Sequence, residues 1–121
     1  MSEPQPSRRL TILTADEIDA LYSCPIFNLE DQIEYFELAP PEQVSLSQLG
    51  KPTSQLYFIL QLGYFKARHR FFQFSLAEVE NDLNYIHARY FSDISVEPEN
   101  LSRATTDRQR DMILELTGYR R

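Results

Sequence analysis

Basic side chains gather in two stretches of the sequence, and their chemistry suits the binding of phosphate groups. Ten of the twelve basic residues are arginines, whose planar guanidinium groups make paired hydrogen bonds to phosphate oxygens and to guanine. Together, the two stretches contain Lys66, Arg68, Arg70, Arg103, Arg108 and Arg110. A protein surface that collects these side chains would bind a polyanion.

The two stretches differ in how well helix electrostatics explains them. Lys66, Arg68 and Arg70 are expected at the end of a helix, where the helix dipole stabilises cations without any ligand. Arg108 and Arg110 are expected in the first turns of a helix that begins at Thr106, where cations oppose the positive end of the dipole. A local rule broken without visible compensation often marks a functional site, so we expect the second stretch to contact phosphate.

Other chemistry finds little support in the sequence. Cys24 is the single cysteine and has no adjacent base that would activate it, so we interpret it as a buried, inert thiol. His69 and His87 are far apart and lack a metal-binding motif. The acidic residues of the N-terminal half fall mostly in the first turns of short helices, which explains them. We therefore predict no catalytic residue, no metal and no cofactor.

Charge is distributed unevenly along the chain, although its net value is −6. Residues 1–50 contain two bases and nine carboxylates, whereas residues 51–75 contain four bases and no carboxylate. Because electrostatic steering acts over a Debye length of about 8–10 Å, an acidic half and a basic face can coexist in one domain.

Apolar residues recur at spacings of three and four, which predicts an all-α protein. With 121 residues, the chain suits one compact domain spanning 1–121, a bundle of about five or six helices, with residues 1–10 flexible. The expected helix starts are capping boxes at Thr14, Ser75 and Thr106 and an N-cap at Asn28.

One segment, 54–67, is apolar on nearly every side and is predicted to be a buried central helix. Gly63 in that helix would either let another helix approach closely or weaken the end of the helix by about 1 kcal/mol relative to alanine. Around it we expect several inward-facing residues in the short helices and a left-handed glycine after each of two helices. The inward residues are Ile33, Phe36, Val44 and Leu46, and the two glycines are Gly50 and Gly118. The helix that follows Ser75 should expose Glu80, Asp82, Asn84, His87 and Arg89.

Several ordered motifs resemble the N-terminal domain of Tn3-family transposases over nearly the whole chain. Leu60-Gln61-Leu62-Gly63-Tyr64 is similar to the family's "ALQLGYLR" helix. The C-terminal set is similar to its "TARRHRxEIRxxLGYR" segment and comprises Thr105, Arg108, Arg110, Ile113 and Gly118-Tyr119-Arg120. Asp107 and Gln109 depart from that segment, and a carboxylate at 107 would repel phosphate.

The resemblance implies an all-helical DNA-binding module that recognises the terminal inverted repeats of a transposon. It matches Arg108, Arg110 and Arg120 to the family's basic positions. Because the catalytic domain of that family lies far downstream, the resemblance implies that these 121 residues are not an enzyme. Their partners would be double-stranded DNA and the remaining transposase domains or a second copy.

Our expectation is thus a DNA-binding domain whose basic face joins the end of the central helix to the start of the last one. The last helix would enter the major groove in a helix-turn-helix manner. The alternatives are a protein-interaction or self-association module, using Phe71, Phe72 and Phe74 as anchors, and a truncated remnant that binds nothing. The N-terminus lacks the apolar run of a signal peptide and no stretch suits a membrane span, so we expect a cytoplasmic protein without a membrane partner.

Overall fold

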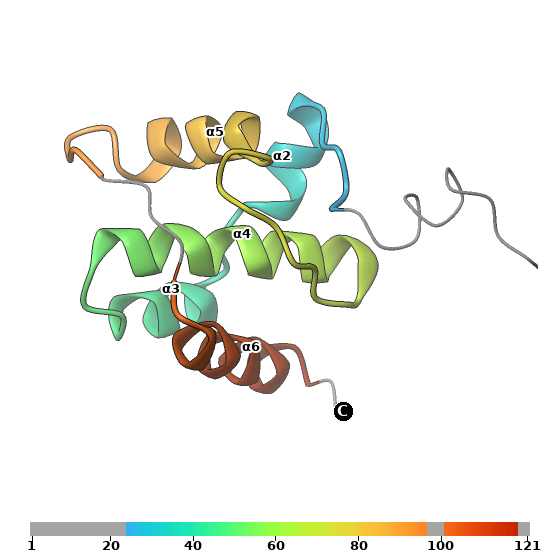
Figure 1. Ribbon diagram of the computed structural model, residues 1–121, viewed down its shortest axis with the longest axis vertical. Helices are drawn as coiled ribbons and strands as arrows, with labels where there is room; N and C mark the ends of the chain where they lie inside the picture. Colours follow the sequence, from blue (N-terminus) through green and yellow to red (C-terminus); the bar gives the residue numbers. More distant parts are fainter. Residues whose placement is uncertain (1–23, 97–100, 119–121) are drawn as a thin grey trace, which may run out of the picture.

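The protein is a bundle of α-helices in the computed structural model, which describes residues 24–96 and 101–118. No strand occurs in these two ranges, so the prediction of an all-α fold is confirmed. The segments 1–10 and the helix expected from Thr14 lie outside the described residues. The described helices (Figure 1) are α2 (Leu29–Tyr35), α3 (Pro40–Ser47), α4 (Pro52–Arg68), α5 (Glu80–Tyr90) and α6 (Arg103–Thr117).

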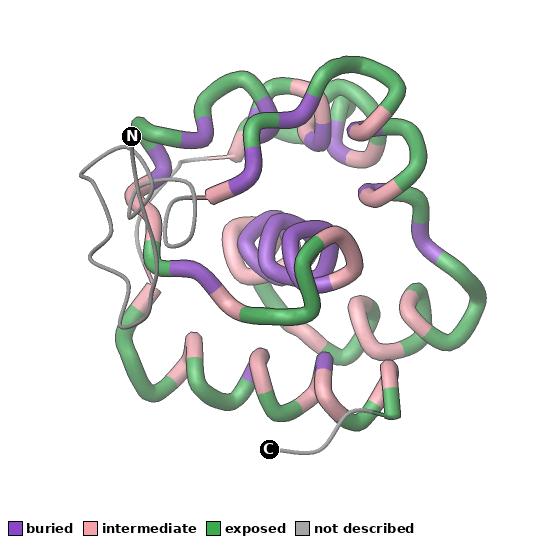
Figure 2. The backbone as a smooth tube through the Cα atoms, turned by 90° about the vertical axis from the view of Figure 1, so that its right-hand side faces the viewer, coloured by how far each residue is buried: buried purple, intermediate pink, exposed green. Residues whose placement is uncertain are grey.

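Helix α4 forms the core of the bundle, as its apolar sequence predicts. Every residue from Leu56 to Phe65 is buried, and Figure 2 shows this helix end-on with the rest of the chain around it. Helices α2 and α5 pack on one side of α4, and α3 and α6 pack on the other (Figure 1). Because neighbours cover all its sides, α4 needs no polar stripe.

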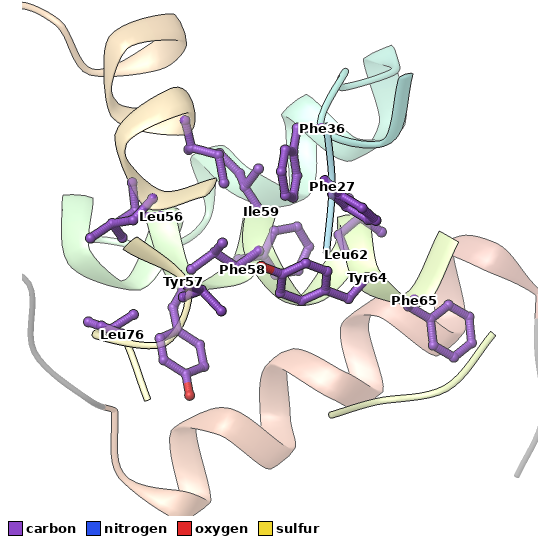
Figure 3. Packing of buried hydrophobic residues seen from close by; sticks show 14 of the residues in the cluster. Phe27, Phe36, Leu56, Tyr57, Phe58, Ile59, Leu62, Tyr64, Phe65 and Leu76 are labelled. Atoms are coloured by element: carbon purple, nitrogen blue, oxygen red, sulfur yellow. The ribbon is translucent and has the colours of Figure 1, made fainter. Parts of the chain in front are cut away.

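The approach of α2 to α4 depends on Gly63. A Cβ atom at this position would overlap the ring of Phe36, which is 1% exposed and follows the last residue of α2. Phe36 also packs against Phe27 and Tyr64, with ring centroids 5.3 and 5.9 Å away (Figure 3). The expected close approach at Gly63 is therefore confirmed.

A buried carboxylate joins α2, α4 and α5. Gln32 Nε2 donates to one oxygen of Asp82 at 2.8 Å, and the hydroxyl of Tyr64 donates to the other at 2.5 Å. The prediction that Asp82 is exposed on α5 was wrong, since it is 6% exposed. It lies three residues after Val79 and four before Ile86, on the buried stripe of the helix. Burial and the hydrogen bond to Asp82 both raise the pKa of Tyr64.

Helix α2 begins as expected but buries a different side chain from the one predicted. The Asn28 cap is confirmed, because its Oδ1 accepts from the Asp31 amide at 2.8 Å. Ile33, expected inside, is 50% exposed, while Gln32 is buried. The seven-residue helix α2 contacts α4 through one narrow face, which Gln32 and Phe36 occupy. Ile33 lies about 100° around the helix from Gln32, so it falls outside this face.

Two predictions for α3 were also wrong. Val44 is 59% exposed instead of buried, and only Leu46 is half-buried. Helix α3 ends at Ser47 and its C-cap, Gln48, has a right-handed conformation, so Gly50 is not a left-handed cap. Gly118, with φ of 75°, does end α6 as expected.

The capping contacts expected at Ser75 form before a later helix start. Glu78 Oε1 accepts from the Ser75 amide at 2.8 Å, and Ser75 Oγ accepts from the Glu78 amide at 3.4 Å. Two tight turns follow, with hydrogen bonds from residue i+3 to residue i, and α5 begins at Glu80. The capping box therefore organises the turn that leads into the helix.

Replacing Gly63 with alanine should destabilise the protein by about 1–3 kcal/mol, because the added methyl group overpacks the Phe36 contact. Alanine otherwise favours a helix interior over glycine by about 1 kcal/mol, so the sign of the change is diagnostic. Urea denaturation followed by circular dichroism measures it. Gly50→Ala is the matched control, since nothing lies within 4 Å of its added Cβ, and it should change stability by less than about 0.5 kcal/mol. A Gly63→Ala variant more stable than the wild type would contradict the close approach.

Candidate nucleic-acid interface

The ammonium group of Lys66 is paired within the protein. Its Nζ atom lies 2.9 Å from Glu42 Oε1 and donates to the Glu37 carbonyl oxygen at 2.8 Å. Glu42 also accepts from the Ala39 amide at the start of α3. This ion pair links α4 to α3 and neutralises the cation, so Lys66 offers little positive charge to an external phosphate.

Arg68 and Arg70 flank the end of α4 and are exposed. Between them His69 adopts a left-handed conformation, with φ of 58°, and its amide closes the helix on the Phe65 carbonyl oxygen. These two arginines lie at the opposite end of α4 from its N-cap, Lys51. From Ser54 to Arg68 the helix rises about 21 Å.

Helix α6 begins one turn earlier than predicted. Ser102 is its N-cap and accepts from the Thr105 amide at 3.2 Å, so the predicted cap at Thr106 was wrong. Arg103 becomes the first helical residue, and Arg108 and Arg110 lie in the second turn. Because the dipole effect fades within the first turn, the helix dipole does not oppose these two arginines, contrary to expectation.

The side chain of Arg110 connects α6 to α4 and to the segment that follows α4. Its Nε donates to Gln61 Oε1 and one Nη donates to the Phe72 carbonyl oxygen, both at 3.3 Å. The guanidinium also lies over the Phe71 ring, 5.3 Å from its centroid. These contacts hold the segment after α4 against α6.

The neighbouring glutamine completes this connection. Gln109 is 1% exposed, accepts from Gln61 Nε2 at 2.7 Å and donates to the Ser54 carbonyl oxygen at 3.0 Å. Gln109, one of the two residues that depart from the similar family segment, is therefore a buried hydrogen-bonding residue. Its signal in the sequence is its spacing of four from Ile113, which is also fully buried.

Arg108 lies on the other flank of α6 from Arg110, about 200° around the helix. It is exposed and borders a hollow of about 320 Å³ between the start of α4 and α6. Gly50 and Ser54 line the other side of this hollow, and its lining contains no carboxylate. Lys51, which lies between these two residues in the sequence, is exposed. Sequence reasoning missed Lys51, although it opens the stretch that lacks carboxylates.

The predicted basic residues thus do not form one face. The start of α6 lies beside the start of α4, where Gln109 reaches Ser54, and not beside the end that carries Arg68. Arg103 is exposed and lies 3.9 Å from Asp107. Arg120 lies outside the described residues. We define the start-end surface as Lys51 and Arg108 together with the backbone N-termini of α4 and α6, since Arg103 lies seven residues before Arg110 and therefore on the other flank of α6.

The start-end surface has favourable electrostatics for anions. Helices α2, α3 and α5 each have carboxylates in their first turn, whereas α4 and α6 have none there. The lining of the neighbouring hollow is neutral apart from Arg108. Two helix N-termini, each with a partial positive charge, therefore lie near two exposed basic side chains, those of Lys51 and Arg108.

Comparison with protein families gives one match. Residues 12–121 match the family described as a domain of unknown function, DUF4158. The chain belongs to the DUF4158 family. Comparison of this DUF4158 domain with curated proteins and with solved structures finds no match.

The remaining reactive side chains of the DUF4158 domain have local structural environments. Burial, with smaller contributions from Glu78 and Asp82, raises the pKa of Cys24 to about 12, so the thiol is protonated at neutral pH. His87 Nε2 lies 2.8 Å from the Ile94 carbonyl oxygen. Residues 24–96 and 101–118 contain no cluster of three His, Cys, Asp or Glu side chains suited to a metal ion. Among the described helices none is both long and apolar enough to cross a bilayer.

Arg110→Ala should destabilise the domain by about 1–3 kcal/mol, because Gln61 and the Phe72 carbonyl group lose a buried hydrogen-bond donor. Thermal unfolding monitored by circular dichroism measures the loss. Arg108→Ala removes an exposed guanidinium from the same helix and should change stability by less than about 0.5 kcal/mol. Equal effects of the two substitutions would contradict the structural role of Arg110.

Proposed function

We propose that this domain binds double-stranded DNA through the start-end surface. The observation that carries the proposal is the meeting of two helix N-termini without first-turn carboxylates beside the exposed Lys51 and Arg108. Backbone amides and arginine side chains at helix N-termini are common phosphate contacts in protein–DNA complexes. The similarity to the N-terminal domain of Tn3-family transposases supports the same proposal and suggests a terminal inverted repeat as the target.

The charge distribution explains how an acidic domain can approach DNA. The carboxylates Glu30, Asp31, Glu34 and Glu37 belong to α2 and the turn after it. Helix α2 packs on the side of α4 opposite α6 (Figure 1). Repulsion from this acidic side would orient the domain so that α6 faces the duplex, since fields of both signs steer association.

The double variant Lys51→Ala with Arg108→Ala should weaken binding to a duplex that carries the transposon end. Each lost phosphate contact reduces the slope of log K against log salt by about 0.9, so the slope should fall by about 1 to 2. Fluorescence anisotropy over a series of salt concentrations measures affinity and slope together.

Arg68→Ala is the matched control for this experiment, because it removes one exposed arginine from the far end of α4. It should leave both affinity and slope nearly unchanged. Loss of affinity in the control equal to that of the double variant would contradict the assignment to the start-end surface. Absence of wild-type binding at low salt would contradict DNA binding itself.

A second candidate function, self-association, is favoured by exposed apolar residues at α2. Ile26, Leu29 and Ile33 are 96%, 61% and 50% exposed, and the last two lie one turn apart on the helix. We call these three residues the α2 stripe. The three aromatic residues expected as anchors pack within the domain. Phe72 is buried, Phe71 packs against Phe65, and Phe74 stacks on Tyr57. Exposed apolar groups at such spacing suit a helix-to-helix contact.

Sedimentation velocity distinguishes this candidate from a purely DNA-binding role. The wild-type protein should form dimers that dissociate on dilution, and Leu29→Glu with Ile33→Glu should be monomeric, because charges cannot enter an apolar contact without loss of affinity. Val44→Glu is the control, since Val44 is exposed on α3 and outside the stripe. A wild-type protein that stays monomeric at high concentration would remove this candidate.

A further inference from the structure

A second hollow, of about 560 Å³, lies between the segment after α4 and the first half of α6. It is distinct from the hollow beside Arg108, because Arg110 and Arg108 occupy opposite flanks of α6. Its lining combines aromatic, basic and acidic side chains, among them Tyr57, Phe74, Glu78, Arg103, Asp107 and Arg110.

Tyr57 brings an unsatisfied hydroxyl group to this hollow. The side chain is 7% exposed, and its ring stacks on Phe74 with centroids 5.1 Å apart. In Figure 3 the ring extends away from α4, with the hydroxyl oxygen at its free end. The hydroxyl has no hydrogen-bond partner within the described parts of the chain. Since polar groups inside proteins are almost always paired, this donor is available to a ligand that enters the hollow.

Arg110 brings an uncompensated charge to the same hollow. Its hydrogen bonds to Gln61 and to the Phe72 carbonyl group use two of the five guanidinium N–H groups, and both acceptors are neutral. No ion pair within residues 24–96 and 101–118 involves Arg110. A half-buried guanidinium without a carboxylate is costly unless another anion approaches it.

The two carboxylates that line the hollow have other contacts. Asp107 lies 3.9 Å from Arg103, and Glu78 accepts from the amide and hydroxyl of Ser75. Among the described residues, neither carboxylate forms an ion pair with Arg110. The donors of Tyr57 and Arg110 in the hollow are therefore not used by these two carboxylates.

We propose that this hollow binds an oxyanion, a phosphate or carboxylate group, which accepts hydrogen bonds from the Tyr57 hydroxyl and the free N–H groups of Arg110. Burial raises the pKa of Tyr57, and the nearby Arg110 opposes this less strongly, so the phenol remains a donor at neutral pH. Arg103 at the mouth supplies a second cation. The inference does not rest on DNA binding, because a free phosphate satisfies the same groups.

Nuclear magnetic resonance of the full ¹⁵N-labelled chain tests the site with inorganic phosphate and acetate as the added anions, each compared with chloride at equal ionic strength. Phosphate should cause saturable shifts in the amides of residues 57, 73–78 and 103–110, and acetate should act on the same amides more weakly. Tyr57→Phe removes only the hydroxyl oxygen and should weaken the apparent affinity about tenfold, as expected for a hydrogen bond to a charged group. Tyr85→Phe, on α5, is the matched control and should leave it unchanged.

Two results would overturn the site: phosphate shifts that do not exceed those of chloride, or equal phosphate affinity in Tyr57→Phe and the wild type. Arg103→Ala is a second variant that leaves the interior of the fold intact, and it should also weaken phosphate binding.

Addition of a duplex to the phosphate-saturated protein identifies the source of the oxyanion. Loss of the phosphate shifts points to a backbone phosphate of DNA, and their persistence points to a small separate ligand. A protein that binds phosphate here and no duplex keeps this site and removes the DNA proposal.

Discussion

The structure depends on the hydrogen-bonding needs of a helix that has no exposed side. Helix α4 buries ten consecutive residues, and two of them, Gln61 and Tyr64, form hydrogen bonds with side chains of other helices. Asp82 of α5 satisfies Tyr64, and Gln109 of α6 satisfies Gln61. The two polar groups thus fix which helix lies on which side of α4, where apolar packing alone would tolerate other arrangements.

The same constraint decides which charges remain available at the surface. Arg110 is half-buried against α4 because Gln61 offers it an acceptor, and Lys66 is neutralised by Glu42 at the junction with α3. Arg108, two residues from Arg110, faces the opposite way and stays exposed. The positive surface therefore lies where α4 and α6 begin, although the sequence concentrates basic residues around the end of α4.

Local chemistry made much of the fold predictable from sequence. The apolar character of residues 54–67 indicated the central helix, Asn28 indicated the start of α2, and Gly118 indicated the end of α6. Long-range pairing was not predictable in the same way. Asp82 was expected on an exposed helix face, and neither Gln32 nor Gln109 was named among the inward-facing residues, yet each is buried through a hydrogen bond to a residue distant in sequence. The misplaced start of α6 had a local origin, because Ser102 and Thr106 both offer a capping hydroxyl, and it is Ser102 that accepts from an amide three residues later.

The narrow attachment of α6 has a consequence for the dynamics of the domain. Its buried residues are Gln109 and Ile113 alone, whereas α4 is enclosed on all sides. The free energy needed to detach α6 is therefore lower than that of global unfolding, and its amides should exchange with solvent through local opening. A ligand that touches both α6 and the first turn of α4 would bind only the closed form. Its binding energy would slow this opening and hold together the least protected part of the protein.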